Sequence, residues 1–237
     1  MTVYGGPDII TDGLVLHLDA ANRKSYPGSG STWYDLSGNG NNGTLTAFTG
    51  NSAGTTSGFD PNTKLMMFDR HLGSSDATAN NRVLINNSDS LDQCLATNGF
   101  TVSFWFKMTS YTCTAMTKWN GSWEVFYCTG LTFRTEGNSD SILQAGVYYG
   151  TYFNQFHLIT TSHTGSTKNI YVNSSLVKTA SNSAGSQNTT NQISIGAYAD
   201  GKYASVGAIP AYHLYNRALS ANEVQQNYNA LKGRYGL

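Results

Sequence analysis

The sequence predicts an all-β protein, a two-sheet antiparallel sandwich with one short C-terminal helix. The chain of 237 residues is rich in glycine, tyrosine and phenylalanine, and only 12% of its residues are charged. Strands favour aromatic and β-branched residues, and turns favour glycine and asparagine. Short apolar runs recur between turn signals along the whole chain. We therefore expect one domain, residues 13–237, behind a short leader, residues 1–12, that is free to act as a docking arm.

The N-terminal part begins with a strand and then becomes rich in turns. Residues 13–19 carry three leucines at alternate positions, so that the leucines share one face. Residues 26–43 contain repeated Asn-Gly pairs, which favour positive φ and tight turns. Within this stretch the Asp35 carboxylate is expected to cap a turn. Two short strands are expected next, at 64–69 and 82–85.

Residues 100–107 form the most regular strand of the sequence. Phe100, Val102, Phe104 and Phe106 alternate with polar residues and Trp105 over this range. We expect Val102, Phe104 and Phe106 to lie between the two sheets. The further expected strands cover 123–127, 131–133, 142–149, 153–161, 169–173, 176–178, 193–196 and 204–215, with a hairpin turn at Ser174-Ser175.

The last segment, residues 221–232, is expected to be a helix. Ser220 and Glu223 have the spacing of a capping box, in which each side chain satisfies a backbone N–H at the start of the helix. Gly233 is expected to end it. One apolar stripe should be buried against the sandwich, and it consists of Val224, Tyr228 and Leu231.

Charge and hydropathy exclude several partners. The 14 basic and 14 acidic side chains balance, and no stretch concentrates lysine or arginine. Nucleic-acid affinity depends on clustered cations, so we expect no nucleic-acid partner. No apolar run approaches the roughly 20 residues that cross a bilayer, so we expect no membrane insertion. Association of the chain into a homo-oligomer is compatible with these features.

The N-terminus and the cysteines indicate production in a cytosol. The first residues lack the basic and apolar regions of a signal peptide. Cys94, Cys113 and Cys128 are odd in number and match no CxxC framework. Three reduced thiols are expected, and a disulfide between Cys113 and Cys128 is the alternative.

The acidic residues do not predict catalysis. A retaining glycosidase needs two carboxylates about 5 Å apart. The three glutamates are Glu124, Glu136 and Glu223; no second acid follows Glu124 on its strand face, and Glu136 lies with Asp140 in a turn. The five histidines have no metal-binding spacing, and His157 is expected at the surface of its strand. We expect a protein that is not an enzyme and requires no cofactor.

Two aromatic loops are the candidates for ligand binding. Their residues are Trp119, Asn120 and Trp123 in one loop and Tyr148, Tyr149 and Tyr152 in the other. Sugar rings stack on aromatic faces and exchange hydrogen bonds with amides and phenols, so a glycan is the expected ligand. The alternative is that these aromatic side chains pack in the core or against another subunit.

Five segments in one order resemble a known family. They read GLVLHLDAAN at 13–22, WYDLSGNGNNGTL at 33–45, FTVSFWF at 100–106, IYVN at 170–173 and LYNRALS at 214–220. Together they resemble laminin-G-like, or concanavalin A-like lectin/glucanase, domains over about residues 13–237. The resemblance implies a jelly-roll arrangement of the two sheets.

The opening and closing segments are most similar to versions of this domain in tailed-phage virion proteins. That resemblance implies a virion structural protein, such as a capsid decoration, fibre or spike component, assembled in the host cytoplasm. Its partners would be other capsid or tail proteins, with cell-surface glycans as adhesion targets. A soluble carbohydrate-binding module outside any virion is the alternative, and a glycoside hydrolase is the third, disfavoured one.

Calcium is the metal that the resemblance implies, because many relatives hold one at the rim of the sandwich. Asp76, in an inserted polar loop, and Asp200 are the hard oxygen ligands available for it. The favoured alternative is that each aspartate only forms a turn. The chain departs from the family after Phe68, where that polar insertion runs to Arg82, so no ligand site is carried over from this region.

Overall fold

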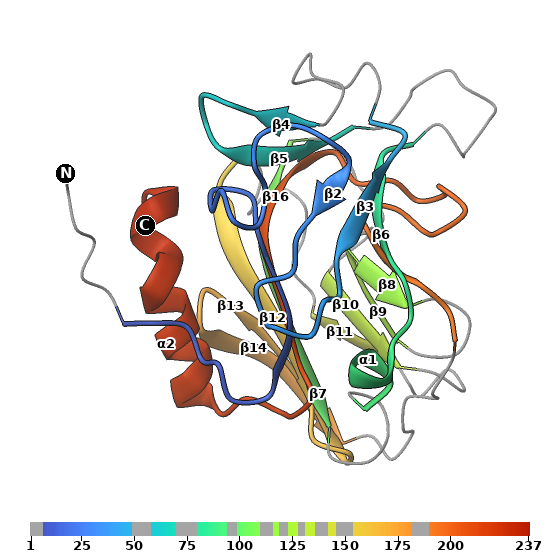
Figure 1. Ribbon diagram of the computed structural model, residues 1–237. Helices are drawn as coiled ribbons and strands as arrows, with labels where there is room; N and C mark the ends of the chain where they lie inside the picture. The colour runs from blue at the N-terminus through green and yellow to red at the C-terminus, as the bar shows by residue number, and fades with distance from the viewer. Residues whose placement is uncertain are drawn as a thin grey trace.

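Two antiparallel sheets stack face to face in the computed structural model (Figure 1), and the described part of the chain contributes eight strands to each. The structure describes residues 7–48, 58–69, 80–93, 99–109, 116–118, 123–127, 131–135, 142–145, 154–181 and 190–237. The predicted all-β sandwich with a C-terminal helix is confirmed. In the described ranges no helix is long and apolar enough to cross a membrane.

Sheet A has the strand order β14-β13-β12-β7-β16-β5-β4. The eighth strand, β1, pairs with the C-terminal part of β16, whereas β5 pairs with the N-terminal end of β16. Its strands are β1 (Leu14–Asp19), β4 (Phe59–Asp60), β5 (Leu65–Phe68), β7 (Phe100–Met108), β12 (Phe156–His163), β13 (Thr167–Val172), β14 (Ser175–Ser181) and β16 (Gly207–Tyr215). Strands far apart in sequence lie side by side at its centre, where β7 pairs with both β12 and β16.

Sheet B has the order β11-β10-β9-β8-β15-β6-β3-β2. Its strands are β2 (Thr32–Trp33), β3 (Gly43–Thr46), β6 (Arg82–Ile85), β8 (Met116–Lys118), β9 (Trp123–Tyr127), β10 (Leu131–Thr135), β11 (Ile142–Ala145) and β15 (Ile193–Ile195). A short helix, α1 (Asp89–Gln93), follows β6. The stretch predicted to be rich in turns, residues 26–43, also contains β2 and the start of β3, and Trp33 is fully buried.

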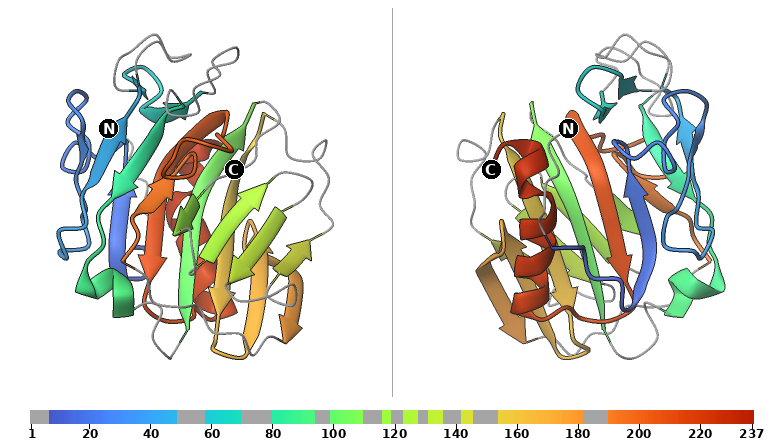
Figure 2. Two further views of the ribbon diagram at one scale, coloured as in Figure 1. Left: turned by 90° about the vertical axis from the view of Figure 1, so that its right-hand side faces the viewer. Right: turned by 60° about the vertical axis from the view of Figure 1, so that its left-hand side comes forward.

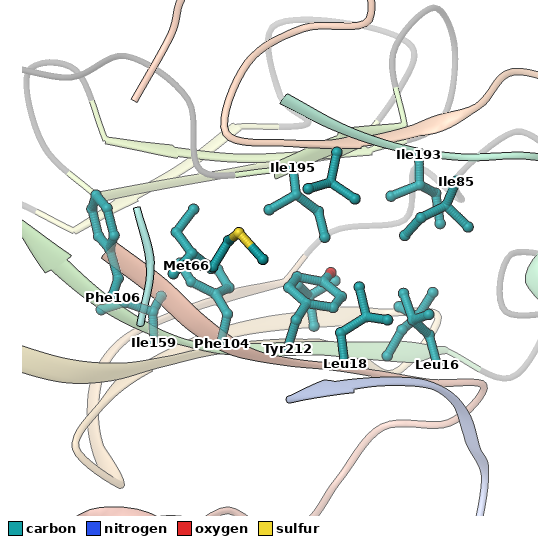
Figure 3. Packing of buried hydrophobic residues seen from close by; sticks show 14 of the residues in the cluster. Leu16, Leu18, Met66, Ile85, Phe104, Phe106, Ile159, Ile193, Ile195 and Tyr212 are labelled. Atoms are coloured by element: carbon teal, nitrogen blue, oxygen red, sulfur yellow. The ribbon is translucent and has the colours of Figure 1, made fainter. Parts of the chain in front are cut away.

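The core lies between the two inner faces. Figure 3 shows Ile85, Ile193 and Ile195 of sheet B opposite Phe104 and Tyr212 of sheet A. The predicted inward positions of Val102, Phe104 and Phe106 are confirmed, since all three belong to this cluster. Period-two alternation therefore gave the correct inner face of β7.

The outer face of sheet A is also covered, by helix α2 (Ala221–Leu231) (Figure 2). Trp105 and Leu158 point to this side and pack with residues of the C-terminal segment. His157, on the opposite face of β12 from Leu158, is consequently buried in the sandwich, with its Nδ1 3.1 Å from Asn173 Nδ2. The expectation of a surface His157 is wrong, because both faces of β12 are covered.

Helix α2 begins where the sequence predicts. Ser220 Oγ accepts the Glu223 N–H, and the Glu223 carboxylate accepts the Ser220 N–H, which completes the capping box. The end differs from the prediction. The chain continues beyond Leu231 as a 3₁₀ turn, Lys232–Tyr235, and the left-handed residue is Gly236 (φ 77°), not Gly233.

Two further local features are resolved. Asp35 caps its turn as predicted, because its carboxylate accepts the backbone N–H groups of Ser37 and Asn41. The β13–β14 hairpin turns at Asn173-Ser174, both with positive φ, one residue before the predicted position.

The described part of the leader crosses α2 (Figure 1). Gln226 donates to the Asp8 carbonyl, and Asn227 accepts the Ile10 N–H. Tyr215 donates its hydroxyl to the Ile10 carbonyl at 3.1 Å. These contacts fix residues 8–10 to the helix that closes the outer face of sheet A.

Candidate functional site

A pocket of about 910 Å³ opens where the C-terminal segment meets one end of sheet A. This volume falls within the range of small-ligand sites. Its walls come from the end of α2 and the 3₁₀ turn, the β4–β5 turn, the end of β7 and the start of β12. The lining residues are Ala21, Thr63, Lys64, Leu65, Lys107, Phe156, Asn229, Ala230, Lys232, Gly233, Arg234, Tyr235 and Leu237.

Aromatic rings form one wall of the pocket. Phe156 and Tyr235 have ring centroids 4.8 Å apart, and Tyr235 in turn lies 4.5 Å from the buried Trp105. Burial raises the pKa of the Tyr235 hydroxyl, so the phenol is neutral at ordinary pH. The wall is therefore a fixed apolar surface, because Tyr235 packs on the buried Trp105.

Three lysines surround this wall. The Lys107 ammonium lies 5.7 Å from the centroid of Phe156, and the Lys232 ammonium lies 5.3 Å from that of Tyr228. Lys64, on the β4–β5 turn, is exposed and donates to the Pro61 carbonyl. The three positive charges thus come from three separate parts of the fold.

The nearby acidic groups offset only part of this charge. None of the described lining residues has an acidic side chain. The Arg234 guanidinium is paired with the buried Asp19 carboxylate at 2.7 Å, which neutralises it. Asp60 accepts from the Thr63 hydroxyl and the Asn62 N–H, and these hydrogen bonds lower its pKa. The pocket therefore keeps a net positive charge and favours an anion.

The aromatic loops predicted as ligand sites lie mostly outside the described residues. This holds for Trp119, Asn120, Tyr148, Tyr149 and Tyr152, while for Trp123 the structure describes only the backbone, as the first residue of β9. The three cysteines, Asp76, Glu136 and Asp140 also lie outside the described part of the chain. The loop site and the thiol assignment stay predictions.

Asp200 has a partner already. Its carboxylate accepts from the Lys202 ammonium at 2.8 Å and from the Lys202 N–H at 3.0 Å, and both side chains are exposed. This is the geometry of a turn-forming aspartate. Among the described residues, no three His, Cys, Asp or Glu side chains gather in a metal-binding group. Calcium stays a prediction.

The two glutamates in the described part of the chain are Glu124, of which only the backbone is described, and Glu223. In the sheet B ladder the neighbours of Glu124 are Thr117 on β8 and Arg134 on β10. Glu223 is held by Arg217 at 2.6 Å, and this contact lowers its pKa to about 2. A group ionised at that pH cannot serve as a general acid near neutrality.

Sequence reasoning missed the pocket. Its cations are separated by tens of residues, so neither spacing nor composition connects Lys64 with Lys107 and Lys232. One local signal was available. Lys232 and Tyr235, which both line the pocket, lie three residues apart directly after the helix.

Comparison with known proteins supports the fold. A family model described as the concanavalin A-like lectin/glucanases superfamily matches residues 76–225. No curated protein matches the chain in sequence.

Solved structures with the same fold include binding domains of bacterial toxins. One, described as showing that botulinum neurotoxin type C depends on two ganglioside molecules to enter cells, is 14% identical over 94% of this chain, with a TM-score of 0.62. A binding domain of botulinum neurotoxin DC with SialylT is 15% identical over 93%, and one with rat synaptotagmin II is 16% identical over 94%, with TM-scores of 0.63 and 0.64. The chain spans about half of these proteins, 52% of each. At these identities the likeness shows a shared fold.

Proposed function

Because the chain belongs to the concanavalin A-like lectin/glucanases superfamily, we propose that it is a non-enzymatic glycan-binding protein whose pocket beside α2 accepts a negatively charged sugar. The single observation that carries this proposal is the position of Lys64, Lys107 and Lys232 around the aromatic wall of Phe156 and Tyr235.

The aromatic wall and the neutral polar groups favour a sugar over a simple ion. The apolar face of a pyranose ring packs on aromatic rings, and its hydroxyls need donors and acceptors nearby. Phe156 supplies such a ring, while Asn229 and Thr63 supply the polar groups. Two structures of the same fold are described with ganglioside or SialylT, which supports a glycan as the ligand class.

The lysines favour a carboxylate or sulfate on that sugar. Hydrogen bonds from an ammonium group to an anion are shorter and stronger than those between neutral groups. The lysines lie around a partly apolar wall, where screening by water is weaker than at an open surface. A neutral sugar would leave these charges without an anionic partner.

The proposal excludes catalysis as the main role. Glu124 has Thr117 and Arg134 as its ladder neighbours, and Glu223 is committed to the helix cap. The cap of Glu223 therefore does not provide the pair of carboxylates that sugar hydrolysis requires, and the sequence places no second acid on the strand face of Glu124. We expect no hydrolysis of β-glucans, and turnover that is lost in Glu124→Gln would contradict this.

A glycan array tests the binding proposal directly. Acidic glycans should bind, and Lys107→Gln should weaken binding by about tenfold or more, since one hydrogen bond to a charged group contributes roughly 1.5–3 kcal/mol. Lys178→Gln is the matched control, because Lys178 is an exposed lysine on β14, outside the pocket lining. Binding that is unchanged in Lys107→Gln and lost in Trp119→Ala would move the site to the predicted aromatic loop.

We further propose that this binding serves adhesion on a tailed-phage particle. The motivation is the similarity of residues 13–45 and 214–220 to virion versions of the domain. Co-purification with capsid or tail proteins, or electron microscopy of labelled particles, tests this role. A protein found only free of particles would favour a carbohydrate-binding module outside the virion.

A further inference from the structure

Three chemically complementary side chains meet where α1 closes one end of sheet B. The Lys118 ammonium donates to Asn87 Oδ1 at 2.6 Å and to Asp92 Oδ1 at 2.9 Å. Asn87 Nδ2 donates to Asp92 Oδ2, also at 2.9 Å. The Lys118 side chain is only 1% exposed, and that of Asp92 is 23% exposed. An amine, an amide and a carboxylate therefore form a closed triangle that is largely shielded from water.

The fold fixes each of the three residues. Lys118 ends β8, which pairs with β9 and β15 in sheet B. Asn87 directly precedes Ser88, whose hydroxyl donates to Asn41 Oδ1 at 2.7 Å, so the start of α1 is tied to the turn before β3. Asp92 lies within α1. The contact is thus built from two separate segments, the end of β8 and the stretch from Asn87 through α1, in which the Asp92 N–H donates to the Ser88 carbonyl at 3.0 Å.

The hydrogen bonds also fix the orientation of the Asn87 amide. Its nitrogen must face Asp92, because a carboxylate only accepts hydrogen bonds, and its oxygen then faces Lys118. The amine consequently lies beside the amide carbonyl, and the carboxylate touches both the amine and the amide nitrogen.

We propose that Lys118 and Asn87 react to form an intramolecular isopeptide bond, with Asp92 as the catalytic acid and base. Asp92 accepts a proton from the Lys118 ammonium, and the freed nitrogen lone pair attacks the Asn87 amide carbon. A new C–N bond forms from Lys118 Nζ to Asn87 Cγ. Asp92 then delivers its proton to Asn87 Nδ2 as the Cγ–Nδ2 bond breaks, and the second proton of the attacking nitrogen passes to the departing ammonia, which leaves as an ammonium ion.

The atoms and charges of this step balance without a co-reactant. One ammonium and one primary amide become one secondary amide and one ammonium ion, and Asp92 returns to its carboxylate form. Nothing is oxidised or reduced. The amine attacks the Asn87 amide and not the Asp92 carboxylate. Attack on a carboxylate would place two negative charges on oxygens bound to the same carbon. The inference does not depend on glycan binding.

The bond would join the segment after β6 to β8 through the side chains of residues 87 and 118. These segments flank β15, the strand between β6 and β8 in sheet B. A covalent link between distant residues reduces the conformational freedom of the unfolded chain, as a disulfide does. Unlike a disulfide, it persists under the reducing conditions of a cytosol.

Intact mass spectrometry of the full folded chain is the decisive experiment. We expect a mass lower than that of the translated sequence by one ammonia molecule, and a protease fragment in which peptides containing Asn87 and Lys118 remain joined. The full calculated mass in protein shown to be folded by circular dichroism overturns the proposal. Loss of water instead of ammonia also overturns it, because water loss would assign the bond to Asp92.

Variants separate the roles of the three residues. Asn87→Ala and Lys118→Ala should each keep their full calculated mass, and Asp92→Ala should do so although its amine and amide remain. Lys202→Ala is the matched control, because Lys202 makes a similar 2.8 Å contact with Asp200 but in an exposed pair. This variant should still lose one ammonia. Ammonia loss that continues in Lys118→Ala would overturn the assignment.

Discussion

The indole of Trp105 and the ring of Tyr228 stack with centroids 5.8 Å apart and planes inclined by 19°. Trp105 lies on the central strand β7 and Tyr228 on α2, so this contact joins the C-terminal helix to the middle of sheet A. Tyr235 packs on the same indole group, with ring centroids 4.5 Å apart. The helix that lines the pocket is therefore held against the outer face of the central strand of sheet A.

Tyr228→Ala should destabilise the protein by about 3 kcal/mol or more, because it removes a ring from a packed aromatic cluster. Urea denaturation followed by tryptophan fluorescence measures this change. Gln225→Ala, at an exposed position of the same helix, should leave stability nearly unchanged. Equal midpoints for wild type and Tyr228→Ala would show that α2 contributes nothing to the stability of the fold.

Ser220→Ala should cost about 1 kcal/mol, since it removes the hydroxyl that accepts the Glu223 N–H at the start of α2. The exposed Ser166, in the bend between β12 and β13, provides the control substitution Ser166→Ala. Thermal unfolding monitored by circular dichroism can compare the two. A loss no larger than that of the control would mean that the Arg217–Glu223 pair alone secures the helix start.

Gly207→Ala should destabilise the protein by about 4 kcal/mol or more, which is exceptionally large for a single substitution. Gly207 has φ 142°, and an added Cβ would lie 2.1 Å from the Lys107 carbonyl oxygen, in the pairing of β16 with β7. Gly30→Ala is the matched control, because Gly30 also has positive φ (90°) but has no atom within 4 Å of an added Cβ. Its cost should be about 1 kcal/mol. Similar unfolding midpoints for the two variants would rule out the steric explanation.

Stability should fall as the pH drops from about 6.5 to about 4. Burial, reinforced by the charge of Lys168, lowers the pKa of His163 from 6.5 to about 4. Below pH 6.5 the unfolded chain takes up a proton on this imidazole group and the folded chain does not, so acid favours unfolding. In His163→Leu this part of the pH dependence should disappear. Urea midpoints at pH 4.5, 5.5 and 7 test it, and parallel curves for both proteins would contradict it.

Local patterns were sufficient where the decisive contacts are local. The alternation of residues 100–107 predicts the inner face of β7, because a strand places successive side chains on opposite sides whatever surrounds it. The Ser220 and Glu223 spacing predicts the start of α2, since both partners of the cap lie within one helical turn. The resemblance to lectin-like domains also rests on short segments, and the family match confirms it.

The sequence by itself thus determined the sandwich, most of its strands and the capped helix. Only the tertiary structure decided what lies against the second face of each strand. It buried His157, because α2 covers the outer face of sheet A while sheet B covers the inner one. It also brought Lys64, Lys107 and Lys232 around one pocket and placed Lys118 against Asn87. These groupings depend on chain segments that are distant in sequence. Burial and charge at such sites are set by how whole strands and helices pack, and a local pattern of residues carries no information about that packing.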